Sequence, residues 1–116
     1  VAGVGISFIL VRAAISIVNQ LQFKTLMGIC AEYSLQMFTN VGFVIDKSLG
    51  ENGEFPYPTD EYITRVLGIM NAYTLETAYS YDKERMLGLR KNVVQQREET
   101  GKKGVFSVDY NLNIKR

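Results

Sequence analysis

Histidine is missing from the sequence altogether, and cysteine occurs only once, as Cys30. Without histidine the chain lacks the commonest metal ligand and the only side chain whose ordinary pKa lies near neutrality. A Ser–His or Cys–His nucleophile pair is therefore excluded within this chain, and we expect no zinc site. A single cysteine forms no disulfide within the chain, so the fold depends on packing, on association with other chains, or on both.

A strong net charge is also lacking, because 13 basic and 12 acidic side chains leave a formal charge of +1. Residues 82–116 carry nine of the basic and five of the acidic side chains. Since acidic residues interrupt this basic tail, we expect a solvated surface there and no nucleic-acid interface. The remaining motifs point to no chemistry: the residues from Asp46 to Tyr57 fail the calcium-loop pattern, and no phosphate-binding or dinucleotide-binding loop occurs. We therefore predict no catalytic residues, no metal and no cofactor.

Length and composition define one small domain. A chain of 116 residues with 47% hydrophobic content is long enough for one globular core and too short for two. The sequence begins without methionine. We interpret it as a single domain over 1–116, in the form of a processed chain or a fragment of a larger protein.

The N-terminal segment is strongly apolar, with only three charged side chains before Asp46. A membrane span needs about 20 apolar residues, and a central charge such as Arg12 costs about 2.5–3.5 kcal/mol on insertion scales. Apolar side chains then recur at three- and four-residue spacing from Arg12 onward, which favours a helix over about 12–47 within an apolar helical region 1–47. We expect this helix to form a core or an interface, with a membrane-associated segment or a buried strand over 4–11 as alternatives.

Two glycines, Asn52 and two prolines interrupt the helical pattern and predict a loop over 48–58. Thr59 is a good N-cap, and apolar residues at helical spacing follow it. We predict an amphipathic helix over about 60–98, within a region 59–100. Such a helix would be about 58 Å long and would need a partner to cover it.

Strict alternation marks the end of the chain and predicts a β-strand over 105–115. An isolated strand must find a partner, which is either the segment 4–11 or the sheet edge of another chain. The side chains on its apolar face are interface candidates: Phe106, Val108, Tyr110, Leu112 and Ile114.

Two further groups of interface candidates come from the remaining polar and aromatic residues. Arg12 lies in an apolar segment and needs a carboxylate or carbonyl partner, which we expect from another segment or chain because Glu32 is too far away. Tyrosine combines contact area with a polar group, as interfaces require. The candidates of this kind are Tyr62, Tyr73, Tyr79 and Tyr81.

The sequence thus predicts an α-rich α+β fold with two long helices, a Gly/Pro loop between them and one C-terminal strand. The function expected is that of a non-enzymatic structural or interaction subunit in a homo-oligomer or a hetero-complex of proteins. Its apolar N-terminal helix would pack in the assembly, and its last strand would pair with a neighbour. Two alternatives remain: a membrane-associated envelope or filament subunit with a layout like that of pilins, and a small helical domain that binds an apolar ligand.

Overall fold

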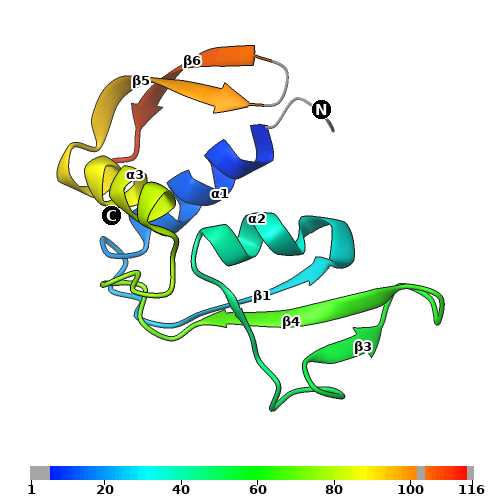
Figure 1. The fold of residues 1–116 in the computed structure, drawn as a ribbon. Helices are drawn as coiled ribbons and strands as arrows, with labels where there is room; N and C mark the ends of the chain where they lie inside the picture. The colour runs from blue at the N-terminus through cyan, green and yellow to red at the C-terminus, as the bar shows by residue number, and fades with distance from the viewer. Residues whose placement is uncertain (1–5, 102–103, 115–116) are drawn as a thin grey trace.

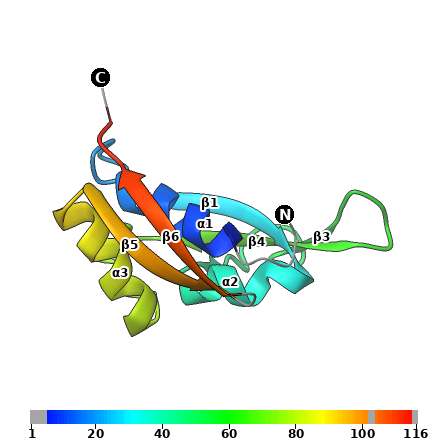
Figure 2. The ribbon, with the colours of Figure 1, turned by 90° about the horizontal axis from the view of Figure 1, so that it is seen from above.

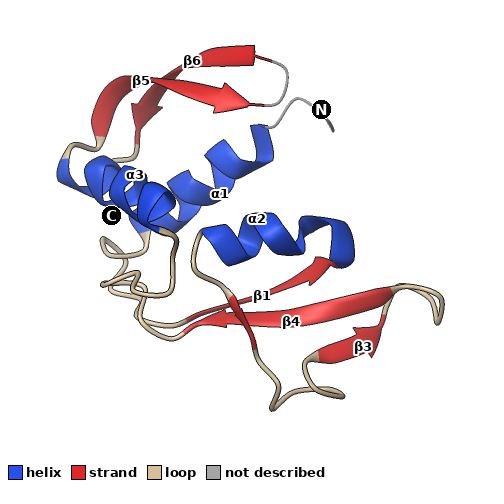
Figure 3. Ribbon diagram, viewed as in Figure 1, coloured by secondary structure: helices blue, strands red, loops and turns tan. Residues whose placement is uncertain are grey.

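The fold consists of two antiparallel sheets with helices between them (Figures 1 and 3). The computed structural model describes residues 6–101 and 104–114. The helices are α1 (Ile6–Ile17), α2 (Leu35–Asn40, after a short 3₁₀ turn at Glu32–Ser34) and α3 (Ser80–Lys91). The strands are β1 (Leu26–Ala31), β2 (Val44–Ile45), β3 (Glu54–Pro56), β4 (Ile63–Ile69), β5 (Val94–Gly101) and β6 (Gly104–Asn111).

Strand β4 is the centre of the first sheet. On one side it pairs with β1, from Leu26 opposite Ile69 to Ala31 opposite Thr64. On its other side it pairs with β2 and then with β3. Helix α2 lies over one face of β1 and β4, as Figure 1 shows. Side chains on that face, such as Cys30 and Leu67, are buried in the core.

The predicted helix over 12–47 is wrong. Helix α1 ends at Ile17, a turn region follows in which Gln22 has a φ of 60°, and the chain re-enters as strand β1. An apolar run as short as Leu26–Ala31 satisfies helical and extended spacing equally well. Backbone hydrogen bonds to β4, which lies more than thirty residues further along the chain, make this segment a strand. The spacing of apolar residues within the segment does not reveal such a distant partner.

The predicted helix over 60–98 is also wrong, and so is the α-rich fold with two long helices, because the described residues form short helices and six strands. Its first third is strand β4, its middle is a loop followed by α3, and its end is strand β5. β-Branched residues at Ile63, Thr64 and Val66 favour the strand. Because the helix starts only at Ser80, Thr59 caps no helix and lies in a turn before β4.

The last strand is present as β6, but it ends at Asn111 and has a partner within the chain. It pairs with β5 along its whole length, from Val94 opposite Asn111 to Gly101 opposite Gly104. The sequence VQQREETG of β5 is polar and shows no alternation, so the partner strand gave no hydrophobic signal. The segment 4–11 does not serve as the partner, because its residues from Ile6 onward form α1 and Val4 and Gly5 lie outside the described residues.

The hydrophobic core has two parts, one on each side of α1. The larger one lies between α1, α3 and the first sheet and contains Leu67, Ile69 and Met86. The smaller one lies under the β5–β6 hairpin and contains Ile9, Leu89 and Tyr110. The chain itself thus covers much of its apolar N-terminal helix, although the sequence analysis expected another chain to cover it. None of the helices formed by residues 6–101 and 104–114 has the length and apolarity needed to cross a membrane.

The turn between β2 and β3 depends on Gly53, whose φ is +82°. A Cβ atom there would overlap the Cγ2 methyl of Ile45. We expect Gly53→Ala to lower the free energy of unfolding by more than about 1 kcal/mol, measured by urea denaturation. Gly28→Ala is the matched control, because a Cβ at Gly28 meets only Phe43, at an ordinary 3.7 Å. Equal stability of the two variants would contradict the prediction.

Candidate functional site

Arg12 does not lie at a surface but in a buried ion cluster, which we define as Arg12, Asp82, Arg85 and Glu99. Its Nε donates a hydrogen bond to Oδ1 of Asp82 at 2.7 Å, and its Nη1 donates one to Oε2 of Glu99 at 3.1 Å. The side chains of Arg12, Asp82 and Glu99 are 8%, 9% and 2% exposed. The expectation that another segment supplies the partner of Arg12 is therefore confirmed, with α3 and β5 as the segments.

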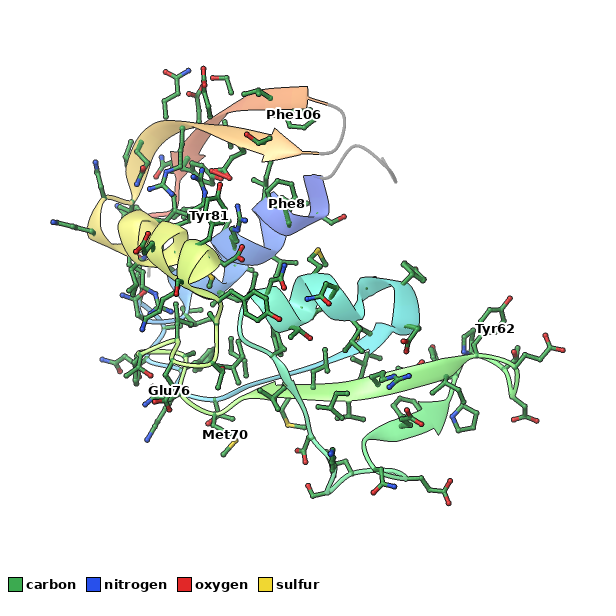
Figure 4. All side chains as sticks on the ribbon, in the orientation of Figure 1. Phe8, Tyr62, Met70, Glu76, Tyr81 and Phe106 are labelled. Carbon is green, nitrogen blue, oxygen red and sulfur yellow. The ribbon has the colours of Figure 1, made fainter. Side chains whose placement is uncertain are left out.

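The charges of the buried ion cluster balance. Arg85 forms a second ion pair with Glu99, so two guanidinium groups face two carboxylates. Burial opposes the charge of Arg85, but the hydrogen bond and charge of Glu99 outweigh it and raise the pKa of Arg85. The ring of Tyr81 lies 5.4 Å from the guanidinium carbons of both arginines, and Figure 4 shows it between α3 and the hairpin. Because arginine engages each carboxylate, the cluster ties α1, α3 and β5 together and leaves no free general base.

The apolar face of the last segment turns toward the interior. Tyr110 is 6% exposed, and Phe106, Val108 and Leu112 pack against it and its neighbours Ile9 and Leu89. Burial raises the pKa of the Tyr110 hydroxyl. The backbone N–H of Ile114 donates to Oε1 of Gln20 at 2.9 Å. Four of the five interface candidates therefore pack in the core under the hairpin, and the fifth, Ile114, is joined to Gln20 through its backbone.

The four tyrosine candidates are exposed but do not share a helix. Tyr81 lies on α3, Tyr79 comes just before it, and Tyr73 belongs to the loop between β4 and α3. Tyr62, which is 60% exposed, lies at the far end of the first sheet (Figure 4). Of the four, only Tyr62 lines the groove at the end of β1.

The face of the first sheet opposite α2 carries exposed apolar side chains. Met27 and Ile29 of β1 are 66% and 56% exposed, Val44 of β2 is 54% exposed, and Met70 after β4 is 76% exposed. Figure 4 shows Met70 below the sheet, on the side away from α2. We call these four residues the open face.

The register of the sheet brings the open face together. Gly68 pairs with Met27 on one side and with Val44 on the other, so no side chain separates these two residues. Ile29 lies two residues further along β1, on the same face of the sheet. Side chains from three separate segments thus form one apolar surface.

A groove continues the open face toward the end of β1. Its volume is about 890 Å³, and it extends from Ile29 and Ala31 to the turn between β3 and β4. Aromatic side chains line it, namely Tyr33, Tyr57 and Tyr62, and Glu32 and Glu61 carry negative charge at it. The positive charge of Arg65 is shared between Glu32 and Glu54, with 2.9 Å from Nη1 of Arg65 to Oε1 of Glu54.

The groove, as the described residues line it, lacks the side chains of a catalytic or metal site. Its one thiol, Cys30, has a pKa that burial raises, so at neutral pH it lacks the thiolate needed for nucleophilic attack. Within the described part of the chain, no three acidic or cysteine side chains are grouped so as to hold a metal ion. Its tyrosine side chains offer apolar contact area together with a hydroxyl group that can form hydrogen bonds.

The sequence did not reveal the open face. Met27 and Ile29 fell within the predicted helix over 12–47, where their spacing placed them on buried sides. The alternation in ITRVLGI, with Ile63, Arg65, Leu67 and Ile69 on one face of the strand, was the available signal. To recognise β4 as a strand, one would also have had to recognise β1 as the strand that pairs with it.

Comparison of the chain with protein-family models, with curated proteins and with solved structures finds no match.

Proposed function

We propose that this chain is a non-enzymatic subunit of a multichain protein assembly and that it binds its protein partner through the open face. The observation that carries this proposal is the cluster of Met27, Ile29, Val44 and Met70, each more than half exposed on one side of a sheet. Contiguous apolar patches on soluble proteins mark sites of interaction.

Burial of the open face would provide the driving force for association. Removing apolar surface from water contributes about 25 cal/mol for each Å². Methionine is flexible and polarisable, and both methionine and tyrosine are enriched at protein interfaces. The two methionines of the open face and the tyrosines of the adjoining groove are therefore the side chains expected at the centre of a contact.

The charge at the groove indicates the chemistry of the partner. Glu32 and Glu61 are both exposed at its walls, and Glu32 is paired with Arg65 while Glu61 adds a further negative charge. A partner with an apolar patch and a basic side chain beside it would complement this surface.

The double substitution Met27→Thr/Ile29→Thr tests the proposal. Threonine keeps β propensity and removes most of the apolar surface, so the fold is expected to persist. We expect partners recovered with the tagged chain, and quantified by cross-linking mass spectrometry, to fall at least about tenfold, because about 1.4 kcal/mol of lost contact corresponds to that factor.

The matched control is Leu10→Gln/Leu87→Gln, which removes exposed apolar side chains from α1 and α3. This variant should recover the same partners as the unchanged chain. Identical partner recovery by both double variants, with unchanged circular dichroism, would rule out the open face as the binding surface.

A further inference from the structure

The strand β1 has one edge that is free of backbone pairing among the described residues. In an antiparallel strand, the N–H and C=O of one residue point to the same side, and alternate residues point to opposite sides. The N–H of Val66 bonds to the carbonyl of Gly53 and its carbonyl accepts from the N–H of Asp46, both at 2.8 Å. Val66 therefore directs its backbone away from β1. Its partner Ile29 consequently directs its own backbone groups away from β4, and Met27 and Ala31 do the same.

Nothing in the sequence of β1 protects this edge. Natural sheets protect exposed edges with charged side chains, prolines, bulges or very short strands. The segment LMGICA has six residues, without a charge or a proline, and pairs with β4 in unbroken register. In Figure 2, β1 forms the border of the first sheet, with no labelled helix or strand beyond it.

We propose that a second copy of this chain pairs with the free edge of β1, antiparallel and about a two-fold axis at Gly28. The inference rests on the proposed function, since it names one partner of the assembly and joins the open faces of two chains. Met27 of each copy would lie opposite Ile29 of the other, with their outward backbone groups hydrogen-bonded to each other. The two first sheets would become one continuous sheet.

Backbone geometry limits the possible registers. Residues whose groups face the free edge have odd numbers, so an odd residue must lie opposite an odd residue. The same condition keeps the open faces of the two copies on one side of the joined sheet. Centres at Met27, Gly28 and Ile29 all meet this condition.

Charge complementarity selects among these registers. Lys24 lies two residues before β1, and Glu32 lies directly after it, at the start of the 3₁₀ turn, where it also pairs with Arg65. With the centre at Gly28, the segment that carries Lys24 in one copy meets the segment that carries Glu32 in the other, and symmetry repeats this meeting at the other end. A centre at Met27 places Lys24 opposite Cys30, and a centre at Ile29 places Glu32 opposite Leu26. Opposite charges just beyond the two ends of the paired strands favour this register, and both Lys24 and Glu32 are exposed.

A pair of substitutions at Ile29 tests the edge, with the mass in solution measured by sedimentation of the full chain over a concentration series. The unchanged chain is expected to show a concentration-dependent shift from 13.1 kDa toward twice that mass. Ile29→Pro removes a backbone donor that points away from β4, so it should abolish the shift while leaving the ladder within the chain intact. Ile29→Thr keeps this donor and should still dimerise. Circular dichroism verifies that both variants fold.

A charge exchange tests the register. Lys24→Glu should weaken self-association by about tenfold, since it places like charges at both ends of the strand pair. Glu32→Lys should do the same, and because it also breaks the pair with Arg65, circular dichroism must show that it folds. Mixing the two variants should restore it, because each end of the mixed dimer then holds one positive and one negative side chain. Lys91→Glu, on the exposed end of α3, is the control and should leave self-association unchanged.

Three results would overturn the inference: a monomer at every concentration, a dimer that persists in Ile29→Pro, or a mixture no stronger than its components. None of these would refute the proposed function, which fails only when Met27→Thr/Ile29→Thr leaves partner recovery unchanged. Unchanged partner recovery by that double variant, together with a dimer that Ile29→Pro abolishes, would refute the open face as the binding surface and leave only the pairing of the β1 edges.

Discussion

Replacing Arg12 with methionine is expected to lower the free energy of unfolding by about 3–5 kcal/mol, because two buried carboxylates then lose a shared cation. Asp82 would lose its only ion pair in the described structure, and Glu99 would keep only Arg85. Methionine fills much of the volume of the arginine stem, so the loss comes mainly from the charges and not from a cavity. Urea denaturation at neutral pH, followed by circular dichroism, measures the change.

A surface charge provides the matched control. Lys91→Met removes a cation from the exposed end of α3, and we expect a change within about 0.5 kcal/mol. A loss of less than about 1 kcal/mol for Arg12→Met would show that the buried ion cluster does not hold α1, α3 and β5 together. Since natural chains have a total stability of about 5–15 kcal/mol, the expected loss is a large fraction of it.

Replacing Arg90 with methionine is expected to lower the free energy of unfolding by about 2–3 kcal/mol, because four backbone carbonyls lose a donor. The guanidinium group of Arg90 donates to the carbonyls of Ile15 and Ser16 at 3.0 and 3.3 Å, at the end of α1. It also donates to those of Ala72 and Tyr73 at 2.6 and 3.0 Å, in the loop before α3. One side chain thus joins two segments to α3.

Arg90 differs from a surface cation in its burial and in its hydrogen-bond partners. Its partners are neutral, and burial lowers the pKa of Arg90. A positive group at the end of α1 also complements the helix dipole. Arg90→Lys keeps the charge but lacks the planar fork of donors, so it should recover less than half of the lost stability. Full recovery by lysine would show that charge alone, and not the set of carbonyl contacts, accounts for the effect.

The same two arginines show how far sequence reasoning reaches. Arg12 stood out because it interrupted an apolar segment, and elementary electrostatics required a partner for it. Which carboxylates serve it was not predictable, since Asp82 and Glu99 lie 70 and 87 residues further along the chain. Arg90 looked like one of many basic residues in the tail. Its partners are backbone carbonyls, which every residue has, so no sequence pattern identifies them.

Some strands were likewise predictable from the sequence and others were not. Alternation in β6 revealed the strand because one of its faces is buried and the other is exposed. Strand β5 is largely polar, and its membership of the hairpin depends on pairing with β6. For β1 and β4 the apolar spacing fitted helices as well, so only the contact between them distinguishes the two structures. The open face lies on these two strands and was therefore hidden together with them.

The amino-acid sequence by itself determined the chemistry: no histidine-based catalysis, no internal disulfide, a Gly/Pro-rich break before residue 59 and a buried arginine in need of a partner. Composition and local backbone preference are properties of single residues and short segments, so the sequence carries them directly. The tertiary structure alone decided which apolar segments became strands, which carboxylates met Arg12 and which apolar side chains stayed exposed. These outcomes depend on hydrogen bonds and contacts between residues far apart in the chain, whose free energy no local pattern contains.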